Sequence, residues 1–133
     1  MASSHFDSLL SEEPIAAFEK TLLPSTEHGA DLRFHGVVRD REEGRVITGI
    51  RYTHYESMAQ RELEKIGAEL AAEWPEHRAM IFHRIGFVAI GEASLLIRVQ
   101  TKHSAEAFLI CQEYVKRIKA TVPIWKEVVF AEG

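Results

Sequence analysis

The sequence has only one cysteine, Cys111, so no disulfide can form within the chain. The first residues, "MASSHFDSLL", lack the basic stretch followed by an apolar one that marks a secretory signal. No apolar run approaches the length needed to cross a membrane. From these absences we expect neither a disulfide-stabilised secreted protein nor a membrane-spanning one. They predict a reducing, cytoplasmic setting in which Cys111 is a buried structural thiol.

The common catalytic motifs are also missing. Seven histidines are present, but no His-x-x-x-His, cysteine pair or carboxylate cluster accompanies them, so scattered surface or core histidines are predicted rather than a metal site. Phosphate-binding glycine patterns and the Gly-x-Ser-x-Gly elbow are absent as well. We therefore expect neither a metal nor an organic cofactor.

Charge of one sign is not in large excess. Sixteen basic and twenty acidic residues give a net charge of −4, which argues against a nucleic-acid-binding surface over the whole chain. With 133 residues, 46% hydrophobic and 27% charged, the chain is large enough to bury one core. We expect a single domain covering residues 1–133.

The hydrophobic periodicity predicts the order α-β-β-α-β-β-α-β. Helices are expected over residues 14–23, from Ser57 (with a capping box Ser57–Gln60) to Trp74, and from Ser104 to a point before Pro123. Strands are expected over residues 32–38, 45–55, 78–90, 93–101 and 125–130, with a weak one in residues 5–10. The third helix is expected to bury Phe108, Cys111, Val115 and Ile118.

Short turns between neighbouring strands indicate antiparallel pairing. Residues 32–38 are expected to pair with residues 45–55 across the charged turn "RDREEG". Strands joined in this way and mixed with helices are typical of an α+β fold rather than a doubly wound one.

One short segment, "KATVPIWKE" (residues 119–127), carries two lysines around a rigid apolar core. Lys119, Lys126, Arg39 and His103 all stand at ends of predicted elements, where binding sites are often built on a rigid scaffold. Each has an ordinary explanation alone, as a solvated charge or a helix-end charge. Together these four residues indicate an anion-binding site, because Arg binds phosphate or carboxylate with a fork and Lys acts as a point charge or nucleophile.

Several motifs give the chain a family resemblance over about residues 32–128. They are "FHGVVR" (34–39), "HYESMA" (54–59), "HRIG" (83–86), "KHSAEAF" (102–108) and "KATVPIWK" (119–126). In this order and spacing the chain resembles the large, catalytic subunit of molybdopterin synthase.

The resemblance implies an α/β hammerhead-type fold with an antiparallel sheet and three main helices. It implies a homodimer within a heterotetramer, whose partner is a small ubiquitin-like sulfur-carrier subunit with a C-terminal Gly-Gly thiocarboxylate. The implied activity is a sulfur transfer to cyclic pyranopterin monophosphate that creates the dithiolene of molybdopterin. Residues from both protomers of the homodimer are expected to meet at the site, and neither nucleic acid nor membrane is an expected partner.

The same resemblance assigns roles by position. Lys119 and Lys126 match the catalytic lysines, with Lys119 acting as acid/base or stabilising negative charge and Lys126 orienting the substrate or the carrier's tail. The substrate-binding positions are Val37, Val38, Arg39, His103, Ser104, Lys119, Lys126, Glu127 and Val128. Pro123 and Trp125 are expected to brace the turn before Lys126.

The chain departs from the family pattern at two positions. Ser104 follows His103 where many members have Arg, and Glu127 follows Lys126 where a basic residue is common. Two alternatives to the enzyme stay open at this point. One is a catalytically weakened paralogue that acts as a carrier-binding module, and the other is a generic anion-binding dimer.

Overall fold

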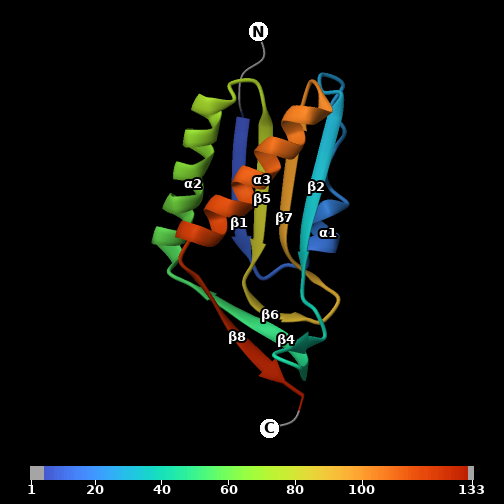
Figure 1. Ribbon diagram of the computed structural model, residues 1–133, viewed down its shortest axis with the longest axis vertical. Coiled ribbons are helices and arrows are strands. Elements are labelled where there is room, and N and C mark those ends of the chain that lie inside the picture. The colour runs from blue at the N-terminus through green and yellow to red at the C-terminus, as the bar shows by residue number, and fades with distance from the viewer. Residues whose placement is uncertain (1–4, 132–133) are drawn as a thin grey trace.

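The computed structural model describes residues 5–131, so the expected domain of residues 1–133 includes two short ends that lie outside the described part. The elements in chain order are β1 (His5–Ser11), α1 (Ile15–Glu19), β2 (Ala30–Val37), β3 (Arg41–Glu42), β4 (Arg45–His54), α2 (Glu56–Glu73), β5 (Arg78–Arg84), β6 (Gly86–Ala89), β7 (Ala93–Thr101), α3 (Ser104–Thr121) and β8 (Ile124–Phe130). They form two sheets and three helices, with the two sheets at opposite ends of an elongated molecule (Figure 1).

The larger sheet has the strand order β1-β5-β7-β2. Strand β7 is buried along nearly its whole length because helices cover both faces of the sheet. Helices α2 and α3 lie on one face (Figure 1), where Ile81 and Ile97 join their core. The neighbouring residues Phe82 and Leu96 point to the other face and pack against Ile15 of α1, as the alternation of side chains along a strand requires.

Both long helices form because their apolar residues recur at helical spacing. On α2 the buried residues are Ala59, Leu63, Ile66, Gly67 and Leu70. On α3 they are Ala107, Ile110, Cys111, Tyr114 and Ile118. Each set forms one stripe that faces the large sheet, and burial of these stripes rather than helix propensity alone stabilises the two helices.

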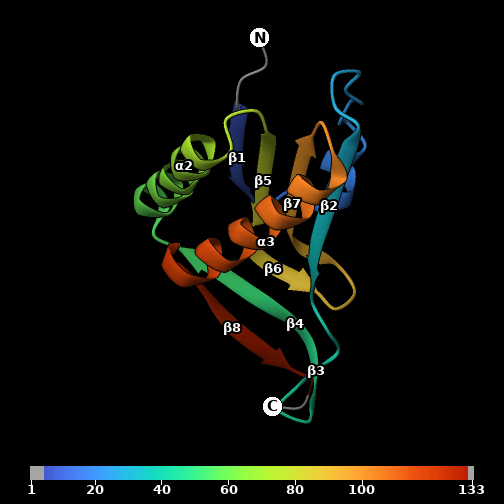
Figure 2. The same cartoon turned by 45° about the horizontal axis from the view of Figure 1, so that its top comes forward.

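The smaller sheet is built around β4, which pairs antiparallel with β3, β6 and β8. The chain enters it from the large sheet after β2 and after β5, and returns to it from the end of α3 (Figure 2). Gly86 has φ +87°, a left-handed conformation that glycine adopts without steric cost, and it turns the chain from β5 into β6. The junction of the two sheets is therefore made by element ends.

Several expectations from the sequence are confirmed. The fold is α+β, its sheets are dominated by antiparallel pairs, and it has three helices. Helix α3 ends at Thr121, before Pro123, and β7 spans residues 93–101. The weak strand at the N-terminus is β1, which pairs with β5 in parallel and is the exception to the antiparallel pattern.

The expected pairing of residues 32–38 with residues 45–55 is wrong. Strand β2 pairs with β7, whereas β4 belongs to the other sheet. The expected strand over residues 78–90 is two strands, because the left-handed turn at Gly86 sends its second half into the small sheet. Strands that are neighbours in the sequence thus lie in different sheets, and the residues of the turns between them do not predict this.

Three helix details also differ. Helix α2 begins at Glu56 after Tyr55, not in a capping box at Ser57, and the Gln60 side chain instead donates to Ser8 Oγ at 2.7 Å. The helix expected over residues 14–23 is limited to Ile15–Glu19. Phe108 is 63% exposed because it lies outside the buried stripe of α3.

Candidate active site

The segment Lys119 to Glu127 joins the end of α3 to β8. The Val122 N–H donates to the Ile118 carbonyl at 3.1 Å and closes the helix, and Pro123 then prevents its continuation. The Pro123 carbonyl accepts a hydrogen bond from the Tyr55 N–H at 3.3 Å, which ties the turn to the start of α2. The two lysines are therefore carried by different elements on the two sides of a fixed turn.

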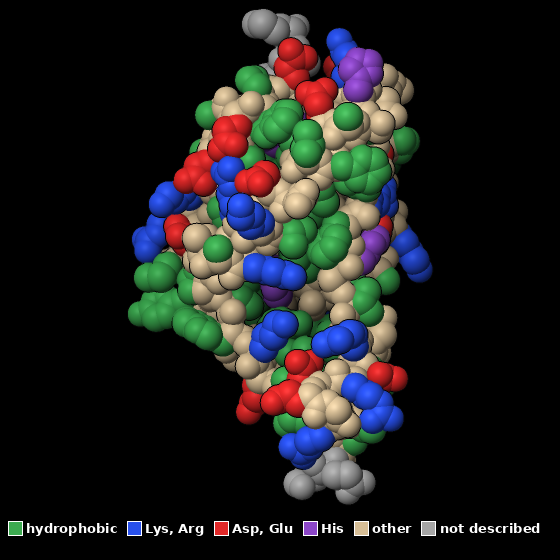
Figure 3. Space-filling view, in the orientation of Figure 1, with side chains coloured by type: hydrophobic (Ala, Val, Ile, Leu, Met, Phe, Trp, Pro, Cys, Tyr) green, Lys and Arg blue, Asp and Glu red, His purple; other side chains and the backbone are tan. Residues whose placement is uncertain are grey.

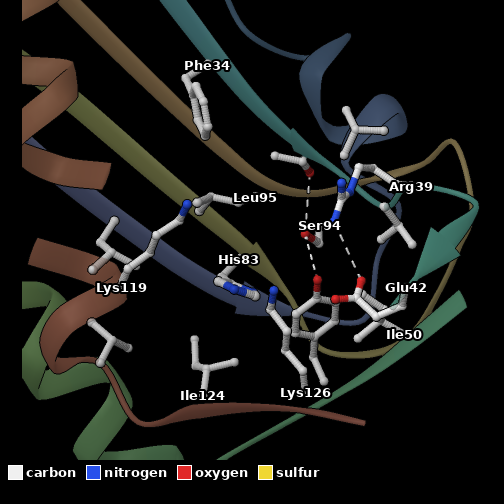
Figure 4. Close-up of a pocket in the computed structure, with 16 residues that line it drawn as sticks. Phe34, Arg39, Glu42, Ile50, His83, Ser94, Leu95, Lys119, Ile124 and Lys126 are labelled. Carbon is white, nitrogen blue, oxygen red and sulfur yellow. Dashed lines mark hydrogen bonds and ion pairs between the residues drawn. The ribbon is translucent and has the colours of Figure 1, made fainter. Parts of the chain in front are cut away.

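A cavity of about 500 Å³ lies at the junction of the two sheets. Lys119 enters it from the last turn of α3, Lys126 from β8, and Arg39 from the segment after β2 (Figure 4). Val37 and Val38 form part of the same wall. The structure thus brings together five of the residues that the sequence indicated.

The cavity is strongly cationic. Its lining contains Arg39, Lys119 and Lys126 against one carboxylate, Glu42, whose oxygen lies 3.8 Å from an Arg39 nitrogen. In the space-filling view, Lys and Arg side chains surround a hollow between the two sheets, with histidine visible at its floor (Figure 3). Three cations against a single carboxylate among the described lining residues favour an anionic ligand.

One wall of the cavity is held by a short chain of hydrogen bonds. The Tyr52 hydroxyl donates to Ser94 Oγ at 3.2 Å, and the Ser94 hydroxyl donates to the Gly36 carbonyl at 3.3 Å. Burial raises the pKa of Tyr52, so the phenol stays protonated and remains a donor. These bonds link β4, β7 and β2 at the point where the two sheets meet.

His83 of β5 forms the floor between the two lysines (Figure 4). Its side chain is buried, and its Nδ1 lies 2.9 Å from the Arg84 carbonyl. Burial lowers the pKa of His83 to about 4, with Lys126 and His54 adding to the shift by repulsion. The imidazole is therefore neutral at physiological pH.

Two of the indicated residues lie elsewhere in the same chain. His103 and Ser104 stand at the start of α3, and Lys119 lies in its last turn. Lys119 follows His103 by sixteen positions along the helix, which at 1.5 Å per residue is about 24 Å. Within one chain, His103 and Ser104 do not reach the cavity.

Glu127 and Val128 are on β8 but do not line the cavity. Side chains alternate along a strand, so Glu127 faces away from the side that Lys126 occupies. The Glu127 carboxylate lies 3.6 Å from Nε of Arg51, its cross-strand partner on β4. Val128 packs against the small-sheet core.

Among the lining residues that sequence reasoning did not single out as site residues are Phe34, Tyr52, His83 and Ser94. Phe34 and His83 occur in the motifs "FHGVVR" and "HRIG", which carried the family resemblance without roles for these side chains. Tyr52 and Ser94 carry no local signal, because their hydrogen bond joins positions 42 residues apart.

Within residues 5–131, no group of three His, Cys, Asp or Glu side chains is placed to hold a metal ion. None of the helices in this described part is both long and apolar enough to cross a membrane.

Comparison with known proteins gives the family. The family model described as "MoaE protein" matches residues 10–121. The molybdopterin synthase catalytic subunit of Pyrococcus abyssi is 39% identical over 122 residues, which cover 92% of this chain and 79% of the relative. The catalytic subunit of Arabidopsis thaliana is longer, and the chain covers 53% of it at 38% identity.

Solved structures agree with these matches. Molybdopterin synthase from Staphylococcus aureus superposes with a TM-score of 0.83 and 32% identity, over 93% of this chain and 91% of that one. A chain from the complex of subunits 1 and 2 of the molybdopterin-converting factor of Helicobacter pylori gives a TM-score of 0.70 over 96% and 90% of the two chains, and at 21% identity it shows the fold alone. The chain belongs to the MoaE family, whose matched relatives are molybdopterin synthase catalytic subunits.

Proposed function

We propose that this chain is the catalytic subunit of a molybdopterin synthase. In this proposal it transfers sulfur from the thiocarboxylated C-terminus of a small, ubiquitin-like carrier subunit to cyclic pyranopterin monophosphate, and two transfers form the molybdopterin dithiolene. It acts in the cytoplasm and uses no metal or organic cofactor of its own.

The observation that carries the proposal is the convergence of Lys119, Lys126 and Arg39 in one cavity from three separate elements. Both reactants are anions, since the substrate bears a cyclic phosphate and the carrier ends in a thiocarboxylate. Arg39 suits the phosphate, because a guanidinium can make two parallel hydrogen bonds to it. The two ammonium groups then face the place where the reacting atoms meet.

The two lysines have different tasks in this proposal. Lys119 is fixed by the last turn of a packed helix, and its neighbour Ile118 is buried. It supplies a proton or stabilises the negative charge that develops as the carbon–sulfur bonds change. Lys126 is on a strand at the opposite side of the cavity and orients the substrate or the carrier's tail.

The remaining indicated residues are proposed to act from the edges of the cavity. Val37, Val38, Glu127 and Val128 contribute mainly through their backbone at the approach for the carrier's tail. His103 and Ser104 are too far from Lys119 in the same chain, so we propose that they complete the cavity of the partner protomer in a homodimer. Each dimer then binds two carriers and forms a heterotetramer.

The direct test mixes the purified chain with thiocarboxylated carrier and cyclic pyranopterin monophosphate, and measures molybdopterin after oxidation to a fluorescent derivative. Product above a control with unmodified carrier is expected. Carrier binding without product would show that the chain is a carrier-binding module and not an enzyme. Absence of both carrier binding and product would leave a generic anion-binding dimer.

A further inference from the structure

Among the described residues that line the cavity, His83 alone combines deep burial with a polar atom that makes no hydrogen bond. Its side chain is 8% exposed, at the end of β5. The Arg84 carbonyl, 2.9 Å from Nδ1, can only accept a hydrogen bond, so Nδ1 carries the proton of the neutral ring. Nε2 is then left with a lone pair. Among residues 5–131 it has no hydrogen-bond partner. No fully buried side-chain nitrogen or oxygen in this part of the chain lacks a partner, so Nε2 must be accessible, and it is accessible from the cavity that His83 lines.

The orientation of the ring is fixed by Tyr52. The two rings meet edge to face, with centroids 5.2 Å apart and an interplanar angle of 69°. Tyr52 is itself held by its hydrogen bond to Ser94. The imidazole therefore cannot swing away without breaking contacts in both sheets.

The same tyrosine places Lys126 beside the imidazole. Tyr52 and Lys126 are directly opposite each other in the β4–β8 ladder, so their side chains lie on one face of the small sheet. Figure 4 shows the Lys126 amine next to the edge of the His83 ring. Lysine offers three donors and no acceptor, whereas Nε2 of this imidazole offers one acceptor and no donor.

We propose that His83 is the positioning residue for Lys126: the Lys126 ammonium group, which lies beside the ring without a hydrogen bond to it in this structure, turns to donate to the free Nε2 and is then held over the cavity floor, opposite Lys119. Because the ring is neutral, it directs the ammonium group without adding a cation that would repel it. A protonated imidazole would have no lone pair at Nε2 and could not do so. The kinetic part of this inference rests on the proposed sulfur transfer.

Two substitutions separate the two sides of the ring. In His83→Gln the side-chain amide reaches the position of Nε2 and can supply an acceptor there. In His83→Asn the shorter amide lies near Nδ1 and can keep the bond to the Arg84 carbonyl, but it leaves the Nε2 position empty. Both variants replace the same imidazole ring by an amide, so a merely structural role predicts similar losses of activity and stability in the two.

The first measurement needs no enzyme activity. The intact protein is treated with a limiting amount of an amine-reactive ester, and modification of Lys126 relative to Lys119 is measured by peptide mass spectrometry. The ratio is expected to rise at least threefold in His83→Asn, where the ammonium group is no longer held, and to stay within twofold of wild type in His83→Gln. Equal ratios in all three proteins would overturn the proposal, whether or not the chain makes molybdopterin.

The second measurement is the steady-state rate of molybdopterin formation. His83→Asn is expected to lower kcat at least tenfold with KM for the pyranopterin changed less than threefold, and His83→Gln to recover most of kcat. Equal kcat in the two variants, with matched melting temperatures, would overturn the positioning role. A wild-type chain that makes no product would contradict the proposed function instead, and the labelling ratio would then decide the His83 contact alone.

Discussion

Lys119 can be separated experimentally from the general positive charge of α3. Lys116 lies one turn earlier on the same helix, is exposed and does not line the cavity. We expect Lys119→Ala to lower kcat by a factor of about 10² or more, as for loss of a group that stabilises developing charge, while carrier binding survives. Lys116→Ala, which removes the same charge outside the cavity, should cost less than threefold. Full activity of Lys119→Ala in the molybdopterin assay would remove it from the mechanism.

The adjacent residues Lys126 and Glu127 provide a second contrast. Their side chains leave β8 on opposite faces, and the Glu127 carboxylate is 74% exposed next to Arg51. We expect Lys126→Gln to lower kcat/KM at least tenfold, and Glu127→Gln to change it less than threefold. A loss at Glu127 as large as that at Lys126 would show that the carboxylate itself contacts a reactant. Titration calorimetry with the carrier separates loss of binding from loss of turnover.

At the scale of single residues, the sequence was informative where several residues of one kind occur together in an unusual pattern. Two lysines flanking Val-Pro-Ile-Trp are unusual, and both enter the cavity. Histidine is less informative, because a buried structural histidine such as His77 and a cavity histidine such as His83 look alike in a strand-rich sequence. Their different environments arise from residues distant in the chain: Tyr114 for His77, and Lys126 for His83.

The link between β5 and β6 is the element whose geometry most affects the site, because β5 carries His83 and β6 pairs with β4 beside Tyr52. Gly86 has φ +87° there, and a Cβ at this position would make only ordinary contacts with Glu12, so the cost of Gly86→Ala is backbone strain. We expect a loss of about 1–2 kcal/mol in the free energy of unfolding, measured by urea denaturation, together with a severalfold lower kcat.

Gly44 is a matched control for this prediction. Its φ is +77°, and nothing lies within 4 Å of a Cβ built on it, so Gly44→Ala should lose a similar free energy without moving the two sheets. If both variants lose activity equally, the effect belongs to stability and not to the β5–β6 link. If neither loses stability, the left-handed turns adapt more easily than expected.

At the scale of elements, periodicity located most helices and strands but not their partners. Strand β7 could be placed to the residue, because the turn at Gly91 and Glu92 precedes it and the polar segment that opens α3 follows it. The sequence does not show that β2 and β4 belong to different sheets, because the segment between them resembles a hairpin turn. That turn does join β3 to β4, whereas β2 pairs with β7 in the large sheet. A two-residue strand such as β3 is too short to give a periodic signal.

The stability of the whole molecule should fall on mild acidification, partly because of His83. Its pKa is about 4 in the folded protein, against about 6.5 for an exposed histidine. Between these values the unfolded chain binds a proton that the folded chain does not, so the free energy of unfolding rises with pH. The contribution is complete above about pH 6.5 and is lost as the pH falls toward 4. The difference amounts to about 2–3 kcal/mol.

The matched comparison for this prediction is His83→Gln, which has no group titrating in that window. Buried His77, whose pKa burial also lowers, acts in the same direction but is common to both proteins. The ion pairs of Asp31 and Glu19 lower the pKa of these carboxyls, so their loss falls at lower pH and is also shared. Urea denaturation at pH 7 and 4.5 should show a smaller loss for His83→Gln. Parallel losses would show that His83 is not buried in the neutral form.

The proposed assembly of the site from two chains leads to the most selective test. His103 and Lys119 are about 24 Å apart along α3, so in the proposed homodimer each cavity combines Lys119 of one protomer with His103 of the other. A dimer of one His103→Ala chain and one Lys119→Ala chain then contains one intact cavity and one with both residues replaced. Two differently tagged chains, co-expressed and purified through both tags, should give about half the activity of the wild-type dimer, although each single-variant homodimer is impaired.

The reciprocal dimer makes the outcome decisive. A wild-type chain paired with a chain carrying both His103→Ala and Lys119→Ala has one replaced residue in each cavity if the cavities are shared, and one intact cavity if they are not. Shared cavities therefore predict activity in the first mixed dimer and its loss in the second, whereas separate cavities predict the reverse. Because both mixed dimers contain one His103, one Lys119 and two alanines at these four positions, differences in folding or expression cannot produce this reversal. The two mixed dimers differ only in whether the two alanines are in the same chain or in different chains.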